Sequence, residues 1–92
     1  MDLNAYMNKL DFSECMRTGN GTIITFLWQK GLEDKTSFAC DINTETKEFT
    51  LKYMSGPTVL TLGPASPYDN EAHLRNMCNA FYKRVKALSV LN

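Results

Sequence analysis

The stretch from Thr22 to Lys30, T-I-I-T-F-L-W-Q-K, constrains the fold of this chain more than any other part of the sequence. Its β-branched and aromatic side chains favour an extended, pleated backbone over a helix. Alternate residues form one fully apolar face, Ile24, Phe26 and Trp28, whereas the other face is only half apolar. Because a strand with apolar residues on both faces is typical of the inside of a sheet, we predict that this strand does not lie at an edge.

Three further segments alternate between apolar and polar residues and predict strands at Thr36–Ile42, Lys47–Tyr53 and Thr58–Leu62. A polar turn at residues 43–46 joins the first two of them, and Ser55-Gly56-Pro57 ends the second. Such short connections imply an antiparallel meander. We expect one sheet face to pack against helices; its residues are Ile24, Phe26, Trp28, Phe38, Cys40, Ile42, Phe49, Leu51, Tyr53, Leu60 and Leu62.

Residues 11–21 leave two alternatives open. Asn20-Gly21 is a strong turn dipeptide, because both residues tolerate a positive φ. Either it closes a hairpin in which Ser13–Thr18 pairs with the Thr22 strand, or it belongs to a loop that leads to the sheet; we favour the strand. After the Thr22 strand comes a charged connection around Gly31.

Each end of the chain predicts a helix. Residues 2–10 carry apolar residues at i, i+3, i+4 and i+7, with Asp2 as a possible cap. Ser66-Pro67 offers a capping hydroxyl followed by proline, so a second helix is predicted from there to about Val90. The apolar stripe of this helix comprises Leu74, Met77, Cys78, Phe81, Val85 and Leu88. Residues 1–92 therefore predict a single α+β domain: an antiparallel four- to five-stranded meander with a short N-terminal and a long C-terminal helix on one face.

This order of elements is similar in layout to that of double-stranded-RNA-binding domains. Those domains carry a Gly-Pro-x-His-like loop between their first two strands and a lysine cluster at the start of the last helix. Here the loop reads Q-K-G-L-E-D-K and the helix opens with Asp69, Asn70 and Glu71, so the RNA-binding motifs of that family are absent. Size and layout also resemble small phage-encoded inhibitors of host systems, without a shared motif.

Composition and charge exclude several classes of protein. Ten basic and ten acidic residues cancel, so no global field attracts nucleic acid or an acidic membrane. No apolar run approaches the roughly 20 residues that span a bilayer, and the first ten residues do not form a signal peptide. Cys15, Cys40 and Cys78 are odd in number and lack C-x-x-C spacing, which predicts free thiols in a reducing compartment. We expect a cytoplasmic protein.

The spacing of reactive side chains argues against catalysis. His73, the one histidine, lies about 140° from Cys78 around the predicted helix, so the two do not form a Cys–His pair. The cysteines and His73 offer no ligand pair for a metal. Gly19-Asn20-Gly21 precedes a strand and therefore lacks the helix N-terminus of a phosphate loop. We expect a protein without enzymatic activity, cofactor or metal; a nucleophilic Cys15 is the least unfavourable enzymatic alternative.

Two surfaces remain as candidates for binding a partner. If both helices cover the apolar sheet face, the second, threonine-rich face stays uncovered, and uncovered apolar patches mark contact sites. Ala39 belongs to this second face. The residues of the face that we expect to bind a partner are Ile23, Thr25, Leu27, Thr50, Lys52, Val59 and Thr61. The outer side of the last helix carries a basic stripe that could follow a phosphate backbone, made of Arg75, Tyr82, Lys83 and Lys86.

The sequence therefore favours a small protein-interaction module, an inhibitor or adaptor that binds a macromolecular partner through the second sheet face. Nucleic-acid binding through the last helix is the alternative, and the phage-type layout makes a viral inhibitor one form of the first hypothesis. A homodimer through the same sheet face is a further alternative, with Leu27 near the two-fold axis.

Overall fold

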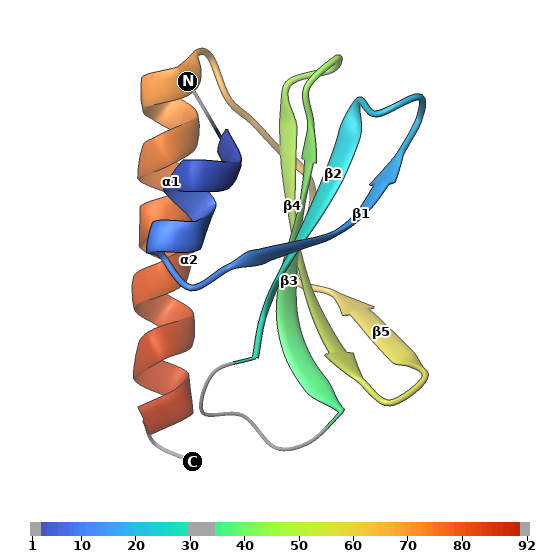
Figure 1. Ribbon diagram of the computed structural model, residues 1–92, viewed down its shortest axis with the longest axis vertical. Helices are drawn as coiled ribbons and strands as arrows, with labels where there is room; N and C mark the ends of the chain where they lie inside the picture. Colours follow the sequence, from blue (N-terminus) through green and yellow to red (C-terminus); the bar gives the residue numbers. More distant parts are fainter. Residues whose placement is uncertain (1–2, 30–34, 91–92) are drawn as a thin grey trace.

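The computed structural model describes residues 3–29 and 35–90. The elements in chain order are α1 (Leu3–Lys9), β1 (Ser13–Thr18), β2 (Ile23–Trp28), β3 (Thr36–Asn43), β4 (Glu48–Ser55), β5 (Thr58–Thr61), β6 (Ser66–Pro67) and α2 (Glu71–Val90). The strands form one sheet in the order β1-β2-β3-β4-β5, and β6 pairs with β4 beyond the end of β5. Both helices lie on the same side of this sheet, which confirms the predicted α+β fold (Figure 1). The expected Asp2 cap and the charged connection around Gly31 lie outside the described residues.

The open alternative for residues 11–21 resolves as a strand. β1 pairs antiparallel with β2, and Gly19, Asn20 and Gly21 all adopt positive φ in the turn between them. Glycine and asparagine reach this left-handed region at low cost, which is why the chain can reverse here. The β1–β2 register shifts between Glu14 and Met16, so β1 contains a bulge at Cys15.

The strongest strand predictions from the sequence form the middle of the sheet. β3 pairs with β2 on one side and with β4 on the other, and the β3–β4 hairpin closes on the polar turn after Asn43. The Asn43 side-chain oxygen accepts hydrogen bonds from the backbone N–H groups of Glu45 and Thr46, both at 3.0 Å. This side chain therefore satisfies two turn donors that the ladder leaves without partners.

The hydrophobic core lies between the sheet and the two helices. Residues opposite each other in the ladders share a face, so Phe26, Cys40 and Leu51 lie in one row across β2, β3 and β4. α2 supplies the opposing layer through a stripe of helical spacing. The buried core consists of Met7, Phe12, Ile24, Phe26, Trp28, Cys40, Ile42, Phe49, Tyr68, Leu74, Cys78, Phe81 and Val85.

The predicted start of the second helix is wrong. Ser66-Pro67 is not the helix N-terminus but a two-residue strand, β6, opposite Glu48 and Phe49 of β4. The helix begins at Glu71, and the Asn70 side chain caps it by accepting a 2.9 Å hydrogen bond from the backbone N–H of His73. Serine followed by proline suits a helix start locally, but here the unpaired edge of β4 takes these residues into the sheet.

Three leucines expected in the core are exposed. Leu60 lies opposite Tyr53 on the helix side of the sheet, yet it is 53% exposed because β5 lies beyond the helical layer. Leu62 is 42% exposed and Leu88 is 48% exposed. Tyr53 is only half buried, with its ring 5.1 Å from that of Phe38. Alternation predicted the faces of the strands correctly but not how far α2 covers them.

The core also contains two aromatic residues that the sequence patterns did not assign to it. Phe12 is fully buried, because Asp11 adopts a φ of 64° after α1 and the Phe12 N–H donates to the Met7 carbonyl at 3.0 Å. This reversal turns the Phe12 ring toward Phe81 of α2, at 5.6 Å between centroids. Tyr68, 8% exposed, donates its backbone N–H to the Lys47 carbonyl at 3.0 Å.

Candidate functional site

The sheet face turned away from the two helices has no helix over it, and we call it the outer face (Figure 1). Strand register places all seven predicted partner-binding residues on it, because each lies opposite another outer-face residue. The rows are Thr25, Asp41 and Thr50; Leu27, Ala39, Lys52 and Thr61; Ser37, Met54 and Val59; and Ile23, Asn43 and Glu48.

A charged network lies at the centre of the outer face. The Thr25 hydroxyl donates a 2.6 Å hydrogen bond to Asp41 Oδ1, and the other carboxylate oxygen of Asp41 pairs with Lys52 Nζ at 2.5 Å. The side chains of Asp41 and Lys52 are 19% and 30% exposed, so water and salt screen this pair less than a fully exposed one. The network links β2, β3 and β4 and leaves the centre of the face close to electrically neutral.

Apolar side chains surround this network. Met16 of β1 and Val59 of β5 are each 54% exposed, and register places both on the outer face. Leu27 is half buried, and Ala39 is fully buried because its short side chain lies between its cross-strand neighbours Leu27 and Lys52. The face therefore combines a neutral polar centre with exposed apolar groups on both edge strands, which suits contact with another protein.

The edge of β1 is poorly suited to pairing with a strand from another chain. Its bulge at Cys15 interrupts the ladder, and Arg17 makes a two-point contact with Glu14, at 2.7 and 2.9 Å. The hydrogen bond from Arg17 holds the pKa of Glu14 below its usual value. Bulges and charges on edge strands prevent edge-to-edge association, so the face of the sheet is the better docking surface.

Only the charged members of the predicted basic stripe of α2 lie on its exposed side. Arg75, Lys83 and Lys86 are exposed, but Tyr82 is half buried and packs against the core, which corrects its predicted place on the side away from the core. Lys86 Nζ lies 5.5 Å from the centre of the Tyr82 ring. Because Lys86 covers the Tyr82 ring and the core holds it, the ring does not offer a free stacking platform for a base. Lys83 lies about 100° from Tyr82 around α2.

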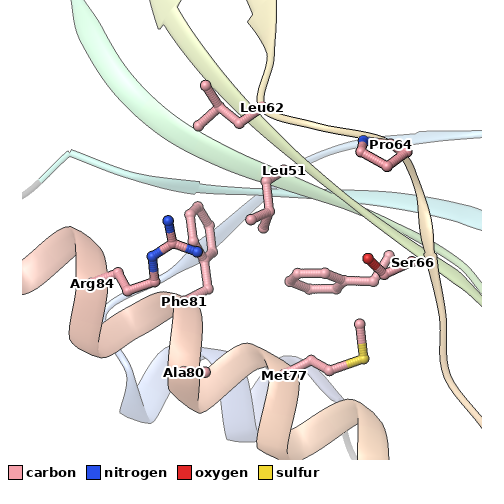
Figure 2. Close-up of a pocket in the computed structure, with 9 residues that line it drawn as sticks. Leu51, Leu62, Pro64, Ser66, Met77, Ala80, Phe81 and Arg84 are labelled. Carbon is pink, nitrogen blue, oxygen red and sulfur yellow. The ribbon is translucent and has the colours of Figure 1, made fainter.

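A hollow opens between α2, the helix-facing side of β4 and the segment that follows β5, and we call it the α2 groove (Figure 2). Its volume is about 330 Å³, and its walls are Phe49, Leu51, Leu62, Pro64, Ser66, Met77, Ala80, Phe81 and Arg84. A second hollow of about 470 Å³ lies at the start of α2, between Leu3, Tyr68 and Leu74 and the polar residues near them.

The reactive side chains do not gather into a metal-binding group within residues 3–29 and 35–90. No group of three or more His, Cys, Asp or Glu side chains is placed there to hold a metal ion. Burial raises the pKa of Cys78 to about 12 and raises that of Cys40 well above its usual value. Cys15 is exposed, but partial burial and the nearby Asp41 carboxylate raise the pKa of its thiol, which weakens it as a nucleophile.

His73 has a structural role near the start of α2. The backbone N–H of Asp69 donates to His73 Nδ1 at 3.0 Å, and the Asp69 carboxylate lies 3.7 Å from the same nitrogen. Because Nδ1 accepts this hydrogen bond, the neutral ring carries its proton on Nε2.

Sequence reasoning left Asp41 and Met16 out of the candidate site, although Asp41 joins the central network and Met16 is an exposed apolar group of the outer face. Alternation in β3 sets Asp41 on the side opposite Cys40 and Ile42, but only the strand register brings it to Thr25 and Lys52. Met16 had no comparable signal, because the bulge at Cys15 changes the alternation of β1.

Comparisons with protein-family models, with curated proteins and with solved structures found no match to this chain. Neither helix of the described part is long and apolar enough to cross a membrane.

Proposed function

We propose that this chain is a non-enzymatic protein-interaction module that binds a partner protein through the outer face, as an inhibitor or adaptor. The observation that carries the proposal is the placement of both helices on one side of the sheet, which leaves Met16, Leu27 and Val59 without a helical cover. Exposed apolar groups around a neutral polar centre are typical of surfaces that another protein covers.

The central network of Thr25, Asp41 and Lys52 supports specific binding, because it restricts which partner surfaces fit over the outer face. Thr25, Asp41 and Lys52 already satisfy one another, so a partner can cover them without leaving a charge unpaired. A charged group of the partner placed over this network would find no free charge to pair with. An apolar or hydroxyl-bearing surface of the partner would cover the network at no such cost. The expected partner therefore presents a flat, weakly charged surface.

The test is capture of a partner from lysate of the native host, with Leu27→Lys as the disrupting variant. The matched control is Leu88→Lys, because it makes the same substitution at an exposed leucine on α2. Leu27→Lys should lose the captured protein while Leu88→Lys retains it, and Val59→Lys at the exposed edge should weaken capture without endangering the fold. Equal capture by all three variants, with native circular dichroism, would reject the outer face as the binding surface.

Two other outcomes identify a different partner. A doubled mass in light scattering that reverts in Leu27→Lys would show that the partner is a second copy of the chain. A mobility shift that weakens steeply with salt, and that is lost on replacing Arg75 and Lys83, would instead favour nucleic acid.

A further inference from the structure

The α2 groove is a separate site from the outer face, and its chemistry points to a small ligand. Its volume of about 330 Å³ falls at the lower end of the range of roughly 300–1,000 Å³ for ligand pockets. The groove exists because Leu62 projects past the cover of α2 and is 42% exposed, although alternation predicts it in the core. An apolar wall that the fold leaves open is therefore available to another molecule.

Most of the residues that line the groove are apolar. Figure 2 shows Met77 and Phe81 reaching from α2 toward the strands, with Leu51 and Leu62 facing them from the other side. The rings of Phe49 and Phe81 lie 6.3 Å apart at 81°. These side chains exclude water from one side of any molecule that enters, so they favour an alkyl or aryl group.

Arg84 is the one charged residue among those that line the groove. It is exposed, it lies at one end of the groove in Figure 2, and no acidic side chain of the described residues forms an ion pair with it. Met77 and Arg84 are seven residues apart on α2, which places them about 10 Å apart along the helix axis. A mainly apolar groove with one guanidinium in its lining is complementary to an apolar molecule with a single negative charge.

We propose that the α2 groove binds a medium-chain aliphatic carboxylate. Its alkyl chain lies along Leu51, Leu62 and Met77, and its carboxylate accepts hydrogen bonds from the Arg84 guanidinium. A guanidinium presents parallel N–H donors that match the two oxygens of a carboxylate. A single cation balances a monoanion, whereas a phosphate monoester would retain excess negative charge in this site.

Methionine methyl groups offer a direct test, with decanoate as the probe and ¹³C-methyl-methionine NMR as the readout. The Met77 signal should shift in a saturable way, whereas the Met16 and Met54 signals should stay in place because these residues lie on the outer face. Loss of partner binding at the outer face would therefore leave this result unchanged. The absence of a saturable Met77 shift, below the concentration at which decanoate forms micelles, would overturn the proposal.

Variants separate the charge from the apolar walls. Arg84→Gln should weaken decanoate binding about two- to fivefold, the range for an ion pair at an exposed site. Lys83→Gln is the matched control, since it removes the same charge from the neighbouring exposed position without touching the groove. Ala80→Phe, also at an exposed helix position, should fill the groove and abolish binding with the fold intact.

Three results would contradict the assignment. If Arg84→Gln and Lys83→Gln weaken decanoate binding equally, the weakening would come from the change in net charge and not from contact with Arg84. Equal affinity for decanoate and for decan-1-ol would show that the carboxylate does not contribute to binding. A Met77 shift with a peptide that ends in leucine, but not with decanoate, would assign the groove to a protein terminus instead.

Discussion

Replacing Phe81 with alanine removes a side chain of α2 that packs against aromatic residues of the sheet. The Phe81 ring is 4% exposed, and its centroid lies 5.6 Å from that of Phe12, 6.2 Å from Phe38 and 6.3 Å from Phe49. Truncating a buried phenylalanine costs about 3–5 kcal/mol, and the loss of two edge-to-face contacts places this variant in the upper half of that range. At roughly 0.05–0.15 kcal/mol per residue, a chain of 92 residues has a free energy of unfolding of about 5–14 kcal/mol, so the loss is a large share of the total.

Leu88→Ala is the matched comparison, because the helical periodicity of the sequence assigns Leu88 and Phe81 to the same apolar stripe. In the structure Leu88 is 48% exposed, so its truncation should cost less than about 1 kcal/mol. Urea denaturation followed by circular dichroism gives both free energies of unfolding, provided that the m-values of the variants agree. Equal losses from the two variants, or a larger loss from Leu88→Ala, would refute the placement of α2 on the sheet.

Three further predictions concern a helix cap, an ion pair and the buried thiols. Asn70→Ala should lower the free energy of unfolding by about 1 kcal/mol, because it removes the capping acceptor, and unchanged thermal denaturation would contradict this. Lys52→Met should destabilise the protein by about 1 kcal/mol, and a double-mutant cycle with Asp41→Asn should show coupling between the two positions that added salt reduces. Because burial raises the pKa of Cys78 to about 12 and raises that of Cys40 as well, the folded state keeps thiol protons that the unfolded chain loses above about pH 8.5. The stability from these two thiols should be complete below that pH and fall as the pH rises; the contribution of Cys78 falls by about 1.4 kcal/mol per pH unit until the pH passes about 12, and replacing both thiols with alanine should flatten the slope.

Short-range patterns in the sequence determine the identity of most elements and the faces of the strands. The alternation in β2, β3 and β4 predicts which residues share a face, because successive side chains of a strand point to opposite sides whatever lies around them. The β-branched run in β2 and the turn residues after β1 and β3 likewise act within a few residues. For the same reason, alternation predicts that the seven residues proposed to bind a partner lie on the face opposite the apolar one.

The tertiary structure alone decides what covers each face and which side chains meet across strands. The burial of Phe12 depends on a left-handed residue at Asp11 and on the position of Phe81, about seventy residues away in the chain. The exposure of Leu62 and the position of Arg84 at the end of the α2 groove depend on how far α2 extends over the sheet. Local propensity does not predict such burial and exposure, because they depend on how the helices and the sheet pack together and not on any single segment. Ser66-Pro67 shows the same limit: these residues suit a helix start locally, but the open edge of β4 takes them into the sheet.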